Sequence, residues 1–437
     1  IGRHPSDPEL AIGWIHVDDV IAMPGMIEKL PHYGKYSYLS FTGSEPTNDV
    51  KGVWSSPNSP MQWVKEGSDY LIELASLPIQ QTLTTLPPKY LPERLSRHVS
   101  ELTDERMQGR GIGSMGIEKA AVYITEQFRR AGLKPINGSY QQKWLQKIEG
   151  SEDVELTNVI GIIPGVNKEL LTQPVIIGAH YDHIGIDENG VLHPGADDNA
   201  SGISVLIEVA AKLSRAYSPQ RPIIFVAFSG EESGLFGSEY FIKNPLSGFE
   251  SEDYFAMVNV DSIGRLDGKN LQIFGSESAY EWPFIAQGIG FTIGVQSEFP
   301  TETIASGDHV SFLNSGVPAI HLFSGMHLDF HQPSDTLDKL DLNGMSNVAL
   351  WLEEASAYLG DRTDPLRVNL ENAKQIQVQR QTSERSASLG TVPDFAYSGE
   401  GVRISGVTPG GAAEEAGLQA LDVLLNYDGE TIEDMQS

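Results

Sequence analysis

Cysteine is absent from the 437 residues of this sequence. A disulfide framework, a thiolate metal ligand and a cysteine nucleophile are therefore excluded. Long hydrophobic runs are absent too, because no apolar stretch approaches the roughly 20 residues of a membrane-spanning helix. Basic residues are scarce: 30 Lys and Arg stand against 59 Asp and Glu, a formal charge of −29. That charge argues against a nucleic-acid partner, whose phosphates would be repelled.

The length of 437 residues exceeds what one ordinary hydrophobic core supports and indicates two or three domains. A hydrophobic content of 40% with 20% charged residues is typical of a soluble globular protein. The sequence begins at Ile1 rather than Met, which is consistent with removal of an upstream signal peptide or domain. We therefore expect a periplasmic or secreted location.

The sequence divides into four regions. Residues 1–94 hold aromatic and Gly/Pro-containing stretches that predict short strands and turns, an N-terminal accessory region of unknown role. From 95 to 362, apolar strands alternate with amphipathic helices. A polar linker is predicted at 363–387, and residues 388–437 form a last block with its own apolar strands.

The alternating region predicts an α/β fold, a three-layer sandwich with a mostly parallel mixed sheet. PVIIGAH, RPIIFVAFSG and YFAMVNVD are typical of buried strands, and VELTNVIGIIPG predicts a strand pair. In such sheets functional groups collect beyond the carboxyl ends of the strands. His180, Glu231, Glu232 and Asp261 all follow or end predicted strands, so we expect them at one edge of the sheet.

Five segments place a His or a carboxylate beside an apolar run, where charge is costly unless a partner or a metal compensates it. They are HYDH (180–183), GADDNASG (195–202), SGEES (229–233), NVDSIG (259–264) and DFHQPSD (329–335). Two adjacent divalent metals can share a water, lower its pKa and polarise an amide carbonyl while a carboxylate takes the proton. Imidazole and carboxylate ligands suit zinc, or cobalt and manganese by substitution.

The five motifs, in this order, resemble those of the bacterial leucyl-type zinc aminopeptidases of metallopeptidase clan MH. The resemblance covers roughly residues 95–360 and implies a zinc exopeptidase-like fold with two zinc ions per chain. It implies that His180 and Asp261 hold one zinc, that Glu232 and His331 hold the other, and that Asp198 bridges the two.

The same resemblance makes Glu231 the general base that deprotonates the shared water and then protonates the leaving amine. Asp182 would orient the first histidine ligand from outside the metal's own shell. Asp198 is preferred to Asp197 as the bridge because the family's bridging Asp immediately precedes the Asn-Ala-Ser-Gly turn. Related enzymes often have Tyr before the late histidine; Phe330 stands there and cannot donate to an oxyanion.

Each motif taken alone also has an ordinary structural interpretation. A lone His at a strand end is usually structural, two adjacent Glu usually form a solvated turn, and Asp before Asn can cap the following helix. His183, His193 and His327 match no ligand position, and we expect them to be structural. Asp308 and His309 resemble the family's S-D-H segment near the substrate pocket, and their role stays open between supporting the site and contacting substrate.

The last block, 388–437, resembles a bacterial PDZ domain. Leu389-Gly390 would receive a peptide carboxylate on backbone N–H groups, and the next strand would pair with the peptide. Leu421 replaces the usual Gly of a later turn, which would distort it. The sequence ends at Ser437, where the groove-forming second helix should begin, so we expect a truncated PDZ-like domain. The alternative is a small β-rich module that only packs on the peptidase.

The motifs together predict a metallo-aminopeptidase that acts on peptide substrates, with no nucleic-acid partner and no membrane span. One alternative is a glutaminyl cyclase-like transferase with one zinc, and another is a catalytically silent peptide-binding protein. The presence of every ligand and of the base favours the peptidase. The residue preference and the choice between aminopeptidase, dipeptidase and carboxypeptidase stay open.

Overall fold

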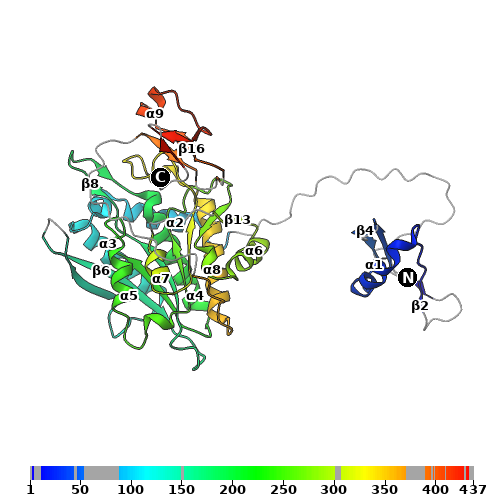
Figure 1. Ribbon diagram of the computed structural model, residues 1–437. Coiled ribbons are helices and arrows are strands. Elements are labelled where there is room, and N and C mark those ends of the chain that lie inside the picture. The colour runs from blue at the N-terminus through cyan, green and yellow to red at the C-terminus, as the bar shows by residue number, and fades with distance from the viewer. Residues whose placement is uncertain are drawn as a thin grey trace, which may run out of the picture. The chain divides into compact units, whose positions relative to one another are not determined.

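The computed structural model describes residues 2–3, 11–43, 47–53, 88–148, 152–300, 307–370 and 389–432, the last range with gaps at 395–396, 398, 409 and 428–429. The chain forms two compact units, Ile1–Thr84 and Thr85–Ser437 (Figure 1). Most of the predicted linker, residues 371–387, lies outside the described residues.

The first unit contains a hairpin and a helix. Its strands are β1 (Gly2–Arg3) paired with β2 (Ala11–Ile12), and β3 (Tyr38–Thr42) paired with β4 (Thr47–Gly52). Besides the predicted strands and turns it has helix α1 (Met23–Lys29), flanked by short helical turns at Val20–Ala22 and Leu30–Tyr33. The Tyr33 ring lies edge-on to Phe41 at 5.5 Å.

The second unit is built on an eight-stranded sheet in the order β13-β12-β14-β11-β7-β10-β6-β5. Strands β14, β11, β7 and β10 run parallel at its centre, whereas β12, β6 and β5 pair antiparallel. The α/β fold with a mixed, mostly parallel sheet is thus confirmed. The strands are β5 (Gln141–Gln146), β6 (Val154–Ile163), β7 (Val175–His180), β10 (Ile223–Phe228), β11 (Ala256–Val260), β12 (Leu271–Phe274), β13 (Ser297–Glu298) and β14 (Ala319–Phe323).

One strand prediction was wrong. VELTNVIGII is not a strand pair but a single ten-residue strand, β6, that hydrogen-bonds β5 on one side and β10 on the other. Its inner residues are buried almost throughout. Strand β5 pairs with residues 154–159 and β10 with residues 159–163, so each part of β6 has a partner strand and no turn is needed in the middle of the apolar run.

Helices cover both faces of this sheet (Figure 1). Alternating strand residues explain the layers: Val175 and Ile177 pack into one hydrophobic cluster, and Ile176 packs into the other. The first cluster includes α2 (Pro92–Leu102), α3 (Met115–Ala131), α4 (Gly202–Ala216), α6 (Trp282–Ile293) and α8 (Leu342–Asp361), and the second includes α5 (Phe236–Lys243) and α7 (His309–Asn314).

The C-terminal segment forms a small antiparallel sheet of β15 (Thr391–Pro393), β16 (Val402–Val407) and β17 (Val423–Leu424), with a short helix α9 (Ala412–Glu415). Two further strands pair next to it, β18 (Asn426–Tyr427) and β19 (Glu430–Thr431). Among the described residues, no helix is both long and apolar enough to cross a membrane.

Candidate metal centre

The carboxyl ends of three adjacent parallel strands bring the candidate ligands together. Strand β7 ends at His180, β10 leads into the loop that carries Glu232, and β11 is followed by Asp261. Asp198 comes from the turn before α4, and His331 from the loop after β14. All five predicted ligands therefore lie in one place, because parallel strands end at the same edge of a sheet.

The turn that carries Asp198 is tied to the sheet by its neighbour Asn199. The Asn199 side-chain amide donates to the Val260 carbonyl at 2.9 Å, and its oxygen accepts from the Gly202 N–H at 3.0 Å. One side chain thus joins the end of β11 to the start of α4. A Cβ on Gly202 would lie 2.2 Å from the Asn199 side-chain oxygen, which explains the glycine in this motif.

Asp198 divides the cluster into two sets of ligand atoms. Its Oδ1 lies 3.3 Å from His180 Nε2, which is 3.2 Å from Asp261 Oδ1. Its Oδ2 lies 3.0 Å from His331 Nε2, which is 3.2 Å from Glu232 Oε2. A carboxylate with one oxygen in each set is the arrangement that two adjacent cations require of a bridging ligand.

His183 belongs to this cluster, although its sequence position matches no ligand. Its Nδ1 lies 2.8 Å from Glu232 Oε1 and 3.7 Å from Asp198 Oδ2. These three residues form one of two groups among the described residues whose ligand atoms all lie within 4.8 Å of one another; the other is His180, Asp198 and Asp261. The sequence signal that could have identified His183 was the second histidine of HYDH, since His-x-x-His is a spacing found in metal sites.

Asp182 positions the loop of the proposed base. Its carboxylate oxygens accept hydrogen bonds from the backbone N–H groups of Glu231 at 3.1 Å and Glu232 at 3.2 Å. His180 Nδ1 lies 3.2 Å from the Asp182 backbone oxygen and 3.8 Å from its carboxylate. Asp182 therefore contacts both the histidine and the double-glutamate loop.

Arg110 also supports the site and was missed in the sequence. It is fully buried, and its Nε donates to the Tyr181 carbonyl while its two Nη atoms donate to Leu102, Pro194 and Gly195 carbonyls, each at 2.8 Å. Burial lowers the pKa of Arg110 to about 10, so it stays charged at neutral pH. These bonds join the segment after His180 to the segment before Asp198.

The outer residues make further backbone contacts. Asp335 Oδ2 accepts from the N–H groups of Asp197 at 2.9 Å and Asp198 at 3.2 Å. His327 Nε2 lies 3.0 Å from Asp197 Oδ2, and His193 Nδ1 lies 3.1 Å from the His331 carbonyl oxygen. These two histidines thus contact residues next to the ligands, His327 through Asp197 and His193 through the His331 backbone.

Three further residues singled out in the sequence, Phe330, Asp308 and His309, lie near these ligands. The Phe330 ring stacks on the imidazole of His331, with ring centroids 4.1 Å apart. Asp308 and His309 are buried. Burial raises the pKa of Asp308 to about 7, and the charges of Asp182 and Asp261 act in the same direction.

The charges of the cluster fit a cation. Burial raises the pKa of Glu231 well above its ordinary value, and the neighbouring charges of Glu232 and Asp261 add to this effect. Arg110 is a nearby fixed positive charge, but its four 2.8 Å hydrogen bonds all go to carbonyls rather than to these carboxylates. Burial opposes a charge on His180 and His331, but the carboxylates around them outweigh it and raise both pKa values well above the ordinary value, so a metal cation would compete with protons for this cluster. The imidazole and carboxylate donors suit zinc or a similar divalent metal.

The comparison with known families agrees with this geometry. The model of peptidase family M28 matches residues 158–355. A probable leucine aminopeptidase from Trichophyton verrucosum is 32% identical over 221 residues, covering 47% of this chain and 56% of that protein. The chain spans about half the length of the curated relatives that it matches.

Solved structures share the fold. The zinc aminopeptidase BSAP from Bacillus subtilis has a TM-score of 0.53 with 17% identity, covering 67% of this chain and 100% of that one. The glutaminyl cyclase of Porphyromonas gingivalis has a TM-score of 0.50 with 19% identity, covering 60% and 96%. Residues 158–355 of this chain are therefore similar to peptidase family M28, and the acids and histidines of this segment gather around Asp198.

Proposed function

We propose that this protein is a zinc-dependent aminopeptidase that hydrolyses amino-terminal residues from peptides. The observation that carries the proposal is Asp198, whose two oxygens face two separate sets of histidine and carboxylate groups. The match to peptidase family M28 and the names of the similar aminopeptidases support it.

Five side chains would hold two zinc ions. His180 and Asp261 would bind one, Glu232 and His331 the other, and Asp198 both. When bound, the zinc pair supplies a water of lowered pKa and polarises the scissile carbonyl. His183 would act on the second site through Glu232 Oε1, at 2.8 Å, and would fix the orientation of that carboxylate.

Glu231 would move the proton. It takes a proton from the attacking water and returns it to the leaving amine, a task that needs a pKa near the working pH. Its pKa is raised by burial and by its acidic neighbours, and bound cations would lower it again. The Asp182 carboxylate accepts a hydrogen bond from the Glu231 backbone N–H at 3.1 Å and so fixes the position of the Glu231 backbone.

Release of 4-nitroaniline from amino-acid anilides tests the proposal. We expect activity in the zinc-loaded protein, loss on chelation, recovery with added zinc, and a drop of at least about a thousandfold in Glu231→Gln with zinc content unchanged. Glu188→Gln, an exposed glutamate in the loop after β7, is the matched control and should retain activity. Full zinc occupancy without hydrolysis of any anilide or dipeptide would contradict the proposal.

A glutaminyl cyclase-like transferase is the second candidate, because a cyclase shares the fold. Two sets of ligand atoms meeting on Asp198 favour the peptidase, which needs two ions, whereas the cyclase needs one. Elemental analysis separates them: two zinc ions per chain are expected for the peptidase. Conversion of an amino-terminal glutamine to its cyclic form by a protein with one zinc would favour the cyclase.

We propose a second binding function for the C-terminal segment, that of a PDZ-like module for peptide C-termini. Strand β15 is at the edge of its three-stranded sheet and follows Leu389-Gly390 directly, where Gly390 has a positive φ of 75°. An edge strand can accept a peptide as an added strand. Binding of a labelled peptide should require a free rather than an amidated C-terminus; equal binding of both would refute this role.

A further inference from the structure

A pocket of about 480 Å³ lies among helices α2, α3 and α4, away from the metal centre's ligands. Its basic lining consists only of arginines and a histidine, and no lysine lines it. The cationic residues are Arg94, Arg97 and His98 on α2, Arg130 on α3 and Arg215 on α4.

The floor of the pocket is a closed network around Glu208 of α4. Arg94 donates to it from Nε at 2.8 Å and from Nη2 at 2.9 Å, a two-pronged contact with both oxygens. His98 Nε2 lies 3.0 Å from Glu208 Oε1, and His98 Nδ1 lies 2.7 Å from the Tyr123 hydroxyl. The Glu208 carboxylate is therefore already engaged by its neighbours.

The rim carries positive charge in excess. Arg97 and Arg215 are exposed, and neither has an ion pair within the described residues. Arg130 shares Glu126 with Arg129 outside the pocket. Four guanidinium groups thus line a space that holds only two carboxylates, those of Glu101 and Glu208.

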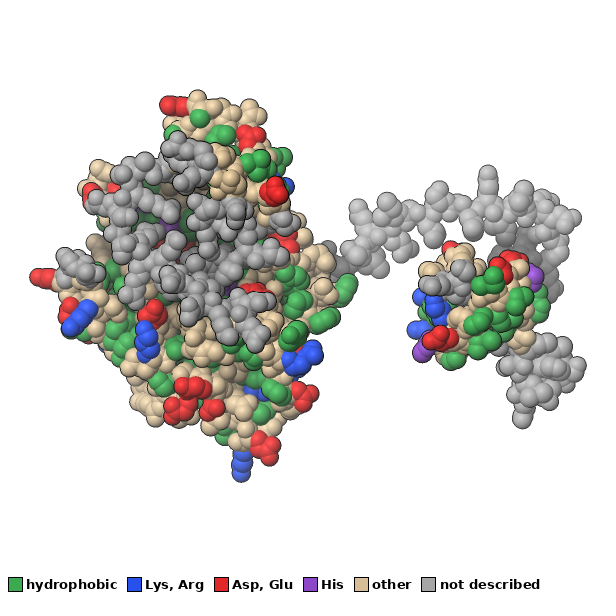
Figure 2. All heavy atoms as spheres, in the orientation of Figure 1, with side chains coloured by type: hydrophobic (Ala, Val, Ile, Leu, Met, Phe, Trp, Pro, Cys, Tyr) green, Lys and Arg blue, Asp and Glu red, His purple; other side chains and the backbone are tan. Residues whose placement is uncertain are grey.

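This local excess contrasts with the rest of the chain. The formal charge is −29, and the face of the second unit in Figure 2 carries acidic side chains in several groups. A chain of this charge repels anions in general, so only a concave basic site would concentrate them. Guanidinium groups bind phosphate and carboxylate oxygens through two parallel hydrogen bonds, which a lysine cannot do.

We infer that this pocket binds a small multivalent oxyanion, whose phosphate or carboxylate groups are held by Arg97 and Arg215 above the fixed Arg94–Glu208 pair. Such a ligand would join α2 to α4 across the mouth of the pocket, because the two free guanidinium groups come from different helices. The inference does not depend on the zinc chemistry, since no proposed metal ligand lines the pocket.

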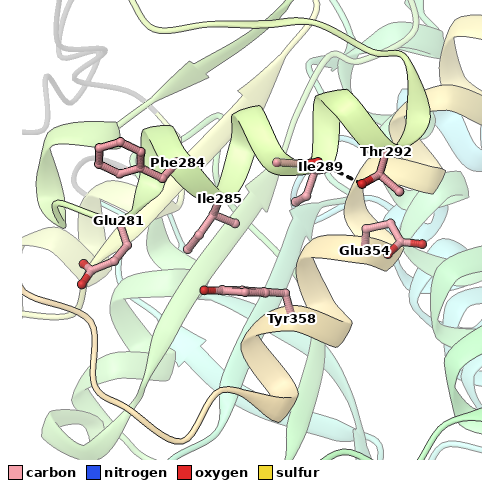
Figure 3. Close-up of a pocket in the computed structure, with 8 residues that line it drawn as sticks. Glu281, Phe284, Ile285, Ile289, Thr292, Glu354 and Tyr358 are labelled. Carbon is pink, nitrogen blue, oxygen red and sulfur yellow. Dashed lines mark hydrogen bonds between the residues drawn. The ribbon is translucent and has the colours of Figure 1, made fainter. Parts of the chain in front are cut away.

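A second pocket, of about 280 Å³ between α6 and α8, differs from the arginine pocket in the charge of its lining. In Figure 3, Ile285 of α6 points towards Tyr358 of α8, and Glu281 and Glu354 are the charged groups of the lining. Glu281 is already paired with Arg362 and Arg367. Apolar walls with acidic residues repel the ligand that four arginines attract.

Calorimetric titration of the full chain with inorganic phosphate, sulfate and succinate, at constant ionic strength and with zinc bound, tests the inference. We expect at least one anion to bind saturably, with the dissociation constant raised at least tenfold in the Arg97→Gln/Arg215→Gln double variant. Both positions are exposed, so the variant should fold, which its melting temperature would verify. Binding of phosphate without succinate identifies a phosphate ligand; the reverse identifies a dicarboxylate.

Arg367→Gln is the matched control, because Arg367 is an exposed arginine that pairs with Glu281 and does not line the pocket. It should leave the dissociation constant within about twofold, because a distant surface charge is largely screened by salt. The inference is overturned if none of the three anions binds the wild-type protein, or if the control weakens binding as much as the double variant does.

Discussion

Arg110 offers the sharpest test of how the fold supports the metal centre. Replacement by Met keeps a long apolar stem but removes every donor. The buried carbonyls of Leu102 and Tyr181 and the half-buried one of Pro194 lose their 2.8 Å partner, whereas the Gly195 carbonyl keeps a bond from the Ala200 N–H at 3.3 Å. An unsatisfied buried polar group costs roughly 1–3 kcal/mol. At the lower end of that range, the two fully buried carbonyls cost about 2 kcal/mol of unfolding free energy, a substantial part of the roughly 5–15 kcal/mol that holds a domain folded.

The effect on zinc should accompany the loss of stability. The bonds from Arg110 fix Tyr181, next to His180, and Gly195, three residues before Asp198. Loss of such outer contacts typically weakens metal binding by about 10–100-fold. Arg110→Lys keeps the charge but loses the planar fork and two donors, so it should fall between wild type and Met in both properties.

Urea unfolding and zinc competition with a chelator measure the two effects. Arg106→Met is the control, since Arg106 is exposed and pairs with Asp104 on the surface. The reasoning fails if Arg110→Met loses less than about 1 kcal/mol and binds zinc as tightly as wild type.

Three further changes have defined outcomes. His331→Ala should lower the zinc content from two ions per chain to one, measured by elemental analysis. His183→Ala should keep both ions and weaken the affinity for the second about tenfold, because His183 acts through Glu232. Loss of an ion in both variants would make His183 a direct ligand. Burial alone would raise the pKa of Glu208, but hydrogen bonds from its basic neighbours outweigh it and lower that pKa below 4.5. The ionised Glu208 therefore stabilises the fold above about pH 4.5, and this contribution is lost as the pH falls through the lower pKa of the folded state. Glu208→Gln and wild type should accordingly differ in melting temperature at pH 7 and converge in acid. A difference that stays constant with pH would refute this. Phe330→Tyr adds a hydroxyl beside His331 and should raise kcat several-fold with little change in KM, if an oxyanion donor is missing there; an unchanged kcat would mean that another donor does this work.

The positions of the site residues could be predicted from the sequence where these residues lie at the ends of strands. His180 and Asp261 follow apolar strands that neighbour each other in the sheet, and parallel strands end at one edge. The alternation of apolar runs was enough to place both. The same reasoning failed at β6, because an apolar run of ten residues has no internal sign of whether it turns or continues.

Arg110 could not be predicted in the same way. All four of its 2.8 Å partners are backbone carbonyls, and three of them lie 71 to 85 residues further along the chain. A carbonyl has no side-chain identity, so no pair of residue types marks the contact. The arginine pocket could not be predicted from the sequence either, since Arg97 and Arg215 line the same pocket only because α2 and α4 pack together.

Buried carboxylates are compensated differently in the arginine pocket and at the candidate metal centre. Glu208 is surrounded by a guanidinium and an imidazole that match its two oxygens. At the metal centre, by contrast, Asp198 and Glu232 face His331, and Arg110 beside them is occupied by carbonyls. Burial opposes a charge on His331, but the two carboxylates outweigh it and raise its pKa well above the ordinary value. An imidazole must lose its proton to bind a metal, and the ionised acids would then repel one another across a few ångströms if no cation replaced the proton. Bound divalent ions remove this repulsion, so metal binding and the stability of this edge of the sheet are expected to be the same property measured in two ways.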